Sequence, residues 1–425
     1  MTKKPARSNA KKMTPELALS GGAPAVKNAV PNWPIAGDLE VAWMEGVVRS
    51  GAWSWKGHHE TAFSREFQNF IGSKYCLCLA NGTVTIQCAL QAVGVRPGDE
   101  VIVPGLTWVA TAQAVLDIGA DVVLVDVNPD TMSLDPKAFD KAITPKTKAV
   151  IPVHLYGCMC DMDAIMKIAQ KHNIKVVEDV AHQHGSRWRN IGAGAIGDAG
   201  SFSFQQSKVL TSGEGGAVTC NDEEIYRIVH CLKQVGWGPD GKAGNEYGHN
   251  YRITEMQAVL LRGGMTRILE QTLKREENAA YLTEQLAKIG GPVQAVKRDP
   301  RVTRQAYYAM TLKFDPRKAD GLTRSQYANA ANREGCALVS PYAPVYANPL
   351  LDLYSSTSPV PYRDQKKIQN FKELKLPGVE KAARETGLLI MHYLLLADKD
   401  FLDQWLIGID KVNSNLKKVA EILAQ

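Results

Sequence analysis

Short runs of β-branched and other apolar residues alternate with helical stretches between residues 75 and 220, and this alternation constrains the fold more than any other feature. Stretches such as residues 162–171, which place Met162, Ile165 and Ala169 on one helical face, separate most of the runs. Apolar strands joined by helices predict an α/β fold with a mostly parallel sheet covered on both faces. Ligands bind at the carboxyl ends of such strands. The expected strands are residues 75–80, 100–104, 121–126, 148–154, 174–179, 201–204 and 216–220.

Lys208 follows one of these strands, in a polar turn that leads to a glycine cluster at residues 213–216. An isolated lysine is usually a solvated loop residue. Here the strand, the turn and the glycines predict a lysine presented inside a pocket, and Asp179 ends a buried strand further upstream. This combination is typical of a Schiff-base lysine and of the acid that keeps a pyridine nitrogen protonated. The residues therefore indicate a pyridoxal 5'-phosphate enzyme.

Gly82 and Thr83 lie between the first expected strand and the helical residues 84–93. Glycine permits a close approach, Thr83 can cap the helix, and amides at a helix N-terminus can hold a phosphate. A plain helix cap is the simpler interpretation of so short a motif, but its place before the first strand-to-helix crossover favours a phosphate site. Ser203, in the strand before Lys208, can offer its hydroxyl to the same phosphate.

Aromatic and histidine side chains follow several of the strands. Trp108 either fills the core or stacks on the pyridine ring. His182 is either a satisfied structural histidine or a contact to cofactor or substrate, and we expect the contact because the residue follows its strand out into the cleft. His154 and Tyr156 end another strand and can face the same space. A zinc site at His182 and His184 needs further ligands at defined spacing, which the sequence does not offer, so we expect no metal.

The composition is that of an ordinary globular protein. The chain has 425 residues, of which 45% are hydrophobic and 22% charged, and it contains no apolar run of transmembrane length. The net charge of +6 depends partly on residues 1–13, which hold five lysines and arginines and no acid. Such a run is either a nucleic-acid arm or, more commonly, a disordered tail. We expect the tail, with neither nucleic acid nor membrane as a partner.

Eight cysteines are scattered through apolar or strand-like surroundings, and no apolar segment after the basic stretch forms a secretory signal. Buried free thiols are the better interpretation in a large chain of this kind. We therefore expect a reduced, cytoplasmic protein.

A long helical pattern at residues 255–289, with Thr254 as its cap, leads to the breaker Gly290-Gly291-Pro292 and then to a strand-like run at 307–314. This pattern predicts three parts. Residues 1–20 form a disordered basic tail, residues 21–289 form a large cofactor domain that includes the linking helix, and residues 290–425 form a small C-terminal domain. Asn250, just before the long helix, is by itself most simply a turn residue.

Several motifs in order along the chain resemble the DegT/StrS family of fold-type I sugar aminotransferases, from about Gly21 to the C-terminus. They are Gly21-Gly22-x-Pro24, Asn81-Gly82-Thr83, Pro104-x-x-Thr107-Trp108, Pro152-Val-His154-Leu-Tyr-Gly157, Glu178-Asp179-x-Ala-His182, the strand into Lys208, Gly213-Glu-Gly-Gly216 and Gly248-x-Asn250-Tyr-Arg252. The resemblance implies that Lys208 forms the covalent link to the cofactor and that Asp179 pairs with the pyridinium. It also implies that Trp108 stacks on the ring and that His182 lies near the cofactor hydroxyl. Gly82, Thr83 and Ser203 then hold the phosphate, and Asn250 reaches it from the neighbouring subunit of a homodimer with shared active sites.

Many family members that act on nucleotide sugars carry histidine soon after the Phe-Ser-Phe strand, whereas this chain has Gln205-Gln206. Together with residues 341–350, this sequence is similar to the L-glutamine:(2-deoxy-)scyllo-inosose aminotransferases of aminocyclitol antibiotic pathways. The resemblance implies amino transfer from L-glutamine to a keto-cyclitol. One alternative is L-glutamate as donor to a nucleotide-linked keto-sugar. A second is a non-catalytic regulatory or binding protein on the same fold, and a third is a related group that makes aminohydroxybenzoate by dehydration.

Overall fold

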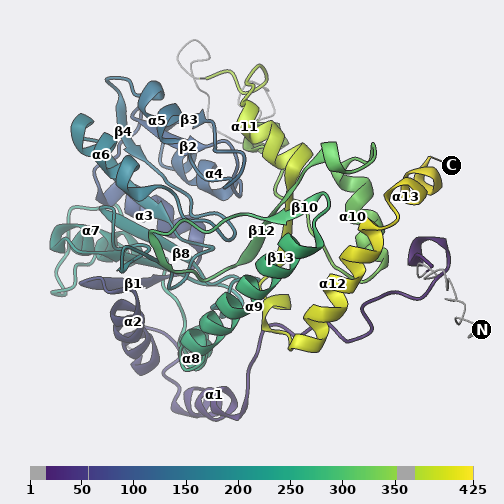
Figure 1. The fold of residues 1–425 in the computed structure, drawn as a ribbon. Helices are drawn as coiled ribbons and strands as arrows, with labels where there is room; N and C mark the ends of the chain where they lie inside the picture. The colour runs from purple at the N-terminus through teal and green to yellow at the C-terminus, as the bar shows by residue number, and fades with distance from the viewer. Residues whose placement is uncertain (1–15, 56, 352–368, 425) are drawn as a thin grey trace, which may run out of the picture.

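A computed structural model describes residues 16–55, 57–351 and 369–424, and a seven-stranded sheet forms its centre (Figure 1). The strands lie in the order β1-β9-β8-β5-β4-β2-β3. Strands β8, β5, β4, β2 and β3 are mutually parallel, and β9 runs antiparallel to both of its neighbours. The predicted α/β class with a mostly parallel sheet is confirmed. The strands are β1 Tyr75–Leu79, β2 Glu100–Pro104, β3 Asp121–Val125, β4 Thr147–Val150, β5 Lys175–Asp179, β8 Ala199–Ser203 and β9 Gly216–Cys220.

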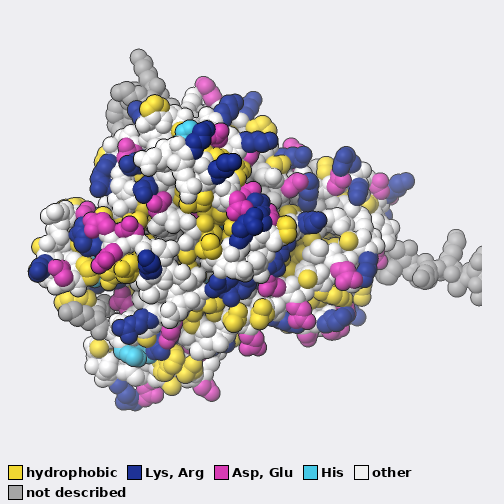
Figure 2. Space-filling view, turned by 60° about the vertical axis from the view of Figure 1, so that its left-hand side comes forward, with side chains coloured by type: hydrophobic (Ala, Val, Ile, Leu, Met, Phe, Trp, Pro, Cys, Tyr) yellow, Lys and Arg dark blue, Asp and Glu magenta, His cyan; other side chains and the backbone are white. Residues whose placement is uncertain are grey.

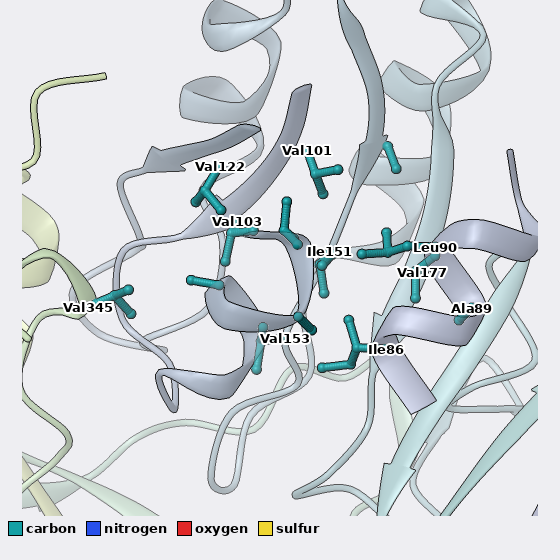
Figure 3. Packing of buried hydrophobic residues seen from close by; sticks show 14 of the residues in the cluster. Ile86, Ala89, Leu90, Val101, Val103, Val122, Ile151, Val153, Val177 and Val345 are labelled. Carbon is teal, nitrogen blue, oxygen red and sulfur yellow. The ribbon is translucent and has the colours of Figure 1, made fainter. Parts of the chain in front are cut away.

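Helices cover both faces of this sheet. On one face Ile86 and Leu90 of α3 pack in the same cluster as Val101, Val103 and other strand residues (Figure 3). On the opposite face phenylalanines of α2 and Ile165 of α6 pack in a second cluster. Burial on both faces explains why the strands are continuously apolar. The helices around this sheet are α1 Asp38–Ser50, α2 His58–Ile71, α3 Gly82–Ala92, α4 Ala110–Asp117, α5 Pro136–Ala142, α6 Met162–His172 and α7 Glu223–Lys233.

The expected long helix is two helices, α8 (Glu255–Met265) and α9 (Ile268–Ile289). Thr254 caps α8, as predicted, because its hydroxyl accepts from the backbone of Gln257. Leu282 and Leu286 of α9 pack in a separate cluster with strands β12 and β13 and with helix α12. The remaining elements are β6 Arg187–Trp188, β7 Ile191–Gly192, β10 Val293–Ala295, β11 Val302–Arg304, β12 Ala309–Phe314, β13 Gly387–Met391, α10 Arg324–Arg333, α11 Pro377–Glu380, α12 Lys399–Asn413 and α13 Leu416–Leu423.

Strands β10, β12 and β13 form an antiparallel sheet, with α9, α10 and α12 around it (Figure 1). The chain thus has a second apolar core beyond Gly290, although α9 contributes to it from the preceding segment. The proposed boundary between a large and a small domain stays a prediction. Short helical turns complete this half of the chain at Pro316–Lys318, Val345–Ala347, Pro349–Leu351, Lys381–Thr386 and Leu394–Leu396.

The expected basic tail at residues 1–20 differs from the structure at its end. Residues 1–15 lie outside the described residues, but Leu17 is only 1% exposed and Ala18–Ser20 form a 3-10 turn. Leu17 packs into the second core, and the Ala18 amide donates to a carboxylate oxygen of Glu334. Apolar burial therefore orders these residues against the C-terminal half.

All eight cysteines are free thiols, and only Cys158 is partly exposed. Over the described ranges, no helix has the length and apolar character needed to cross a membrane.

Candidate active site

A cavity of about 800 Å³ opens where β1, β2, β5 and β8 end. Because these strands are parallel to one another, their carboxyl ends bring residues distant in sequence to one edge of the sheet. All the residues predicted to contact the cofactor except Asn250 line this cavity, namely Gly82, Thr83, Trp108, Asp179, His182, Ser203 and Lys208.

Lys208 is buried at the floor of the cavity, with 8% of its surface exposed. Its Nζ lies 4.7 Å from the centre of the Tyr308 ring. Burial lowers the pKa of Lys208 to about 8, and the nearby charge of Asp179 only partly opposes this effect. The amine is therefore half deprotonated near pH 8, which suits a nucleophile for a carbonyl carbon.

Asp179 ends β5 and is buried. Its Oδ2 accepts from the Thr111 hydroxyl at 2.9 Å, and its Oδ1 accepts from the Ala181 amide at 3.1 Å. A second hydroxyl, that of Thr107, lies 3.0 Å from the Thr111 hydroxyl. Burial raises the pKa of Asp179, while these hydrogen bonds and Lys208 favour the charged form. A buried carboxylate held in this way can pair with one cationic nitrogen that enters the cavity.

His182 is held as a neutral ring. Its Nδ1 accepts from the backbone amide of Tyr156 at 3.2 Å, so the proton of the neutral imidazole is on Nε2. Burial, followed by the positive charge of Lys208, lowers the pKa of His182 well below its ordinary value. The ring stacks on Tyr308, with centroids 3.8 Å apart and planes at 11°. His182 thus presents one N–H group toward the cavity.

Asn81, rather than Thr83, caps helix α3. The Asn81 Oδ1 accepts from the amides of Thr83 and Val84 at 3.1 and 3.0 Å, so the expected capping role of Thr83 is wrong. The physical reason is that asparagine at the preceding extended position reaches these amides. A Cβ atom on Gly82 would lie 2.6 Å from the Cβ of Ser203, so only glycine allows the helix start to approach β8 this closely. The positive end of the helix dipole and the hydroxyls of Thr83 and Ser203 make this corner suitable for a phosphate.

Trp108 lies at the mouth of the cavity and is 57% exposed. Its ring lies 5.4 Å from that of Tyr342 at an interplanar angle of 55°. Asn250 is exposed and does not line the cavity of its own chain. Its Oδ1 accepts from the Arg252 amide at 3.4 Å.

His154, Tyr156 and His184 lie behind the cavity wall and do not line it. The Nε2 of His154 lies 3.0 Å from Oε2 of Glu178, and the Tyr156 hydroxyl accepts from the Tyr342 amide at 2.7 Å. His184 Nε2 lies 2.8 Å from the Ser203 carbonyl. These side chains therefore support the cavity wall, which corrects the expectation that His154 and Tyr156 face the cleft.

The sequence did not identify Thr111 or Tyr342 as site residues. Thr111 carries no motif, because its role depends on how α4 lies beside β5. Tyr342 lies in the segment after α10, far along the sequence from the other residues that line the cavity. Its hydroxyl lies 3.4 Å from His182 Nε2. In the part of the chain that the structure describes, no group of three or more His, Cys, Asp or Glu side chains is arranged to hold a metal ion.

Comparison with known proteins gives a consistent family match. The model of the DegT/DnrJ/EryC1/StrS aminotransferase family matches residues 35–386. A putative L-glutamine:3-amino-2,3-dideoxy-scyllo-inosose aminotransferase of Streptomyces kanamyceticus is 37% identical, over 96% of this chain and 99% of its own. The L-glutamine:2-deoxy-scyllo-inosose aminotransferase of Micromonospora echinospora is 35% identical, over 95% and 99%. The L-glutamine:scyllo-inosose aminotransferase of Streptomyces griseus is 35% identical, over 96% and 100%.

Solved structures agree with this match. A 3-amino-5-hydroxybenzoic acid synthase has a TM-score of 0.81 at 30% identity, over 91% of this chain and 99% of its own. An aminotransferase from Psychrobacter cryohalolentis has a TM-score of 0.82 at 31% identity, over 92% and 100%.

Proposed function

This chain belongs to the DegT/DnrJ/EryC1/StrS aminotransferase family, and on that basis we propose that it uses pyridoxal 5'-phosphate to move the amino group of L-glutamine to a keto-cyclitol. The expected aminotransferase fold class and activity class are confirmed. The observation that carries the choice of substrates is that relatives named for L-glutamine and a scyllo-inosose align over nearly the full length of this chain.

The residues around the cavity fit this cofactor. Gly82, Thr83 and Ser203 would hold the phosphate, because the helix start and β8 leave a corner that a Cβ would fill. Asp179 would hold the proton of the pyridine nitrogen, and Trp108 would cover one face of the ring. When bound, pyridoxal 5'-phosphate supplies an electron sink for the bond broken at the α-carbon of the amino donor.

Lys208 is the residue that moves protons. Its amine lies in the same cavity as Asp179 and has a pKa near 8, so an uncharged Nζ is available to remove the α-proton of L-glutamine and to return a proton in the second half of the reaction. His182 stays neutral, so its Nε2–H group would be available to donate to the hydroxyl oxygen of the cofactor.

The polar lining supports an uncharged acceptor. Among the described residues that line the cavity, Lys208 is the only lysine or arginine. A nucleotide-linked sugar carries a diphosphate, which proteins usually bind with several cationic side chains. The other polar lining residues are mostly neutral, as a polyhydroxylated ring requires, and they include Asn81, Thr107, Ser203, Gln205, Ser207 and Tyr342.

Exposed apolar side chains near Asn250 support a homodimer with shared sites. Val235 is 55% exposed, Trp237 52% and Tyr247 86%. Large apolar side chains gathered on one exposed segment are typical of a protein interface. Association through this segment would allow Asn250 to reach the phosphate in the neighbouring subunit.

A non-catalytic nucleic-acid-binding role has less support. On the face that Figure 2 shows, Lys and Arg side chains are interspersed with Asp and Glu rather than gathered in one basic patch. Nucleic-acid binding generally needs a continuous positive surface. The presence of Lys208 and Asp179 in one cavity also favours an enzyme over a silent binding protein.

The function can be tested with the cofactor-loaded enzyme and a panel of substrates. L-Glutamine and L-glutamate would each be combined with scyllo-inosose, 2-deoxy-scyllo-inosose and nucleotide-linked keto-sugars, and products identified by mass spectrometry. We expect an aminocyclitol formed with L-glutamine. Amination of nucleotide-linked sugars alone would replace the proposed acceptor, and no amination of any ketone would refute the proposed reaction.

A further inference from the structure

Gln205 lies in the turn between β8 and Lys208 and is one of the residues that line the cavity. Its Oε1 accepts from the backbone amide of Ser207 at 2.9 Å and from the Ser207 hydroxyl at 2.7 Å. A backbone amide can only donate, so this contact settles which end of the carboxamide is the oxygen. The Nε2 of Gln205 therefore faces away from Ser207, and it has no hydrogen-bond partner among the described residues.

A second contact holds Gln205 in this orientation. The Ser207 hydroxyl uses its one proton on Gln205, so it accepts from the Tyr308 hydroxyl, 3.1 Å away. Tyr308 is buried, lies under Lys208 Nζ and stacks on His182. Gln205 is thus tied through Ser207 to the same aromatic ring that contacts Lys208 and His182. A carboxamide fixed in this way binds with little loss of side-chain freedom.

The unpaired group is an uncharged donor. Carboxylates and phosphates are bound best by charged donors such as arginine, whereas a neutral amide matches a hydroxyl or a ketone oxygen. The phosphate corner is formed by other residues, at Gly82, Thr83 and Ser203. In the proposed reaction, the partner that carries many uncharged oxygen atoms is the polyhydroxylated acceptor.

We propose that Gln205 is a specificity-determining residue that donates Nε2–H to one hydroxyl of the cyclitol acceptor. This assignment rests on the proposed function and adds to it the atom that recognises the ring. Ser207 and Tyr308 are positioning residues, since they hold the carboxamide and do not themselves supply the free donor.

The test compares Gln205→Glu with Gln206→Glu. Glutamate keeps an oxygen for Ser207 but replaces the N–H donors with an oxygen that can only accept, so a ring hydroxyl could stay bonded only by turning its own proton away from its other partner. Gln206 is the exposed neighbour outside the cavity lining, and its variant makes the same charge change. The two half-reactions would be followed separately by the absorbance change of the cofactor in single turnovers. We expect Gln205→Glu to lower kcat/KM for the keto-cyclitol by about 10- to 100-fold, the scale of an unpaired buried hydrogen-bonding group. The L-glutamine half-reaction should change less than about threefold, and Gln206→Glu should change neither.

A cycle with deoxy substrates separates recognition from a general structural effect. Keto-cyclitols that each lack one hydroxyl would be tested with the wild type and Gln205→Glu. We expect one analogue to be about tenfold or more worse for the wild type but not for the variant, since the donor and its hydroxyl form one interaction. An effect of the added charge on Lys208 acts equally on every substrate. It therefore cancels when the ratio of kcat/KM for the full and the deoxy substrate is compared between the wild type and the variant. Additive losses for every analogue, or equal losses in both half-reactions, would overturn the assignment of Gln205.

A binding measurement needs no turnover. The unreactive polyol scyllo-inositol should bind Gln205→Glu about tenfold more weakly than it binds the wild type or Gln206→Glu, as measured by calorimetry. Equal affinities would contradict the role of Gln205. A wild type that reacts with L-glutamine but with no keto-cyclitol would instead refute the proposed acceptor, and with it this assignment.

Discussion

The hydroxyl of Thr111 donates to Oδ2 of Asp179 over 2.9 Å, in a part of the cavity where both side chains are buried. The Ala181 amide donates to the other carboxylate oxygen, at 3.1 Å. Asp179 is therefore oriented by its surroundings before any ligand enters. This preorganisation lets its charge act on a ring nitrogen without first rearranging the site.

Replacing Asp179 by asparagine tests the importance of that charge. Asp179→Asn should leave the protein folded but slow proton removal from L-glutamine, because a neutral amide does not hold the ring-nitrogen proton. We expect a cost of at least about 3 kcal/mol in the chemical step, measured by single-turnover kinetics. Thr111→Val removes only one hydrogen bond to the carboxylate and should raise the barrier of the same step by about 1 kcal/mol. Near-normal rates for Asp179→Asn would mean that another acid has this role.

The lowered pKa of Lys208 predicts how cofactor capture depends on pH. Burial disfavours the charged amine, which brings its pKa from 10.5 to about 8. Only the neutral amine attacks an aldehyde, so the rate at which apoprotein forms its covalent link with pyridoxal 5'-phosphate should rise through pH 8 and level off above it. The visible absorption band of the lysine-bound cofactor measures this rate. A midpoint near 10.5 would contradict the burial argument.

Lys208→Ala is the control for that measurement. This variant should bind pyridoxal 5'-phosphate without the covalent link and lose turnover by several orders of magnitude. Borohydride reduction of the wild type should fix the pyridoxyl group on Lys208, as peptide mapping can establish. A label on any other lysine would refute the assignment.

Gly82 provides a test of the phosphate corner. A Cβ at this position would lie 2.6 Å from the Ser203 Cβ, so Gly82→Ala must push helix α3 and β8 apart. We expect a loss of about 1–3 kcal/mol in the free energy of unfolding, with weaker binding of pyridoxal 5'-phosphate. Gly46→Ala is the control, since a Cβ there meets nothing within 4 Å and alanine favours the surrounding helix α1. Equal stability and cofactor affinity for Gly82→Ala and the wild type would show that this corner tolerates a side chain.

Local sequence patterns predicted the sheet because each strand is a short apolar run buried on both faces. The same patterns put Asp179 at a strand end and Lys208 in the turn after a strand, and the parallel topology brings both residues to one cavity. The cap of α3 was misassigned because Asn81 and Thr83 are both good capping residues, and only the backbone geometry distinguishes them. Local propensity therefore determined the elements but not each terminal residue.

Contacts between distant segments could not be predicted in this way. Tyr342 reaches the cavity because the segment after α10 folds back over the large sheet, and no periodic pattern encodes that approach. The separation of α8 from α9 at residues 266–267 was also missed, although Gly263 and Gly264 just before the break have low helix propensity. Glycine weakens a helix without forbidding it, so tertiary packing decides where the helix ends.

Asn250 allows the site and the assembly to be tested together. It is exposed, it lies outside the cavity of its own chain, and its side-chain amide nitrogen makes no hydrogen bond among the described residues. If it holds the phosphate across a dimer interface, Asn250→Ala and Lys208→Ala homodimers should each be impaired. After subunit exchange, one site of every heterodimer contains both intact residues, whereas the other contains neither. Equal amounts give about half heterodimers, so activity should recover to roughly a quarter of wild-type sites. Exchange verified by mass spectrometry without recovery would place Asn250 and Lys208 of one chain in the same site, and the shared-site proposal would then be abandoned.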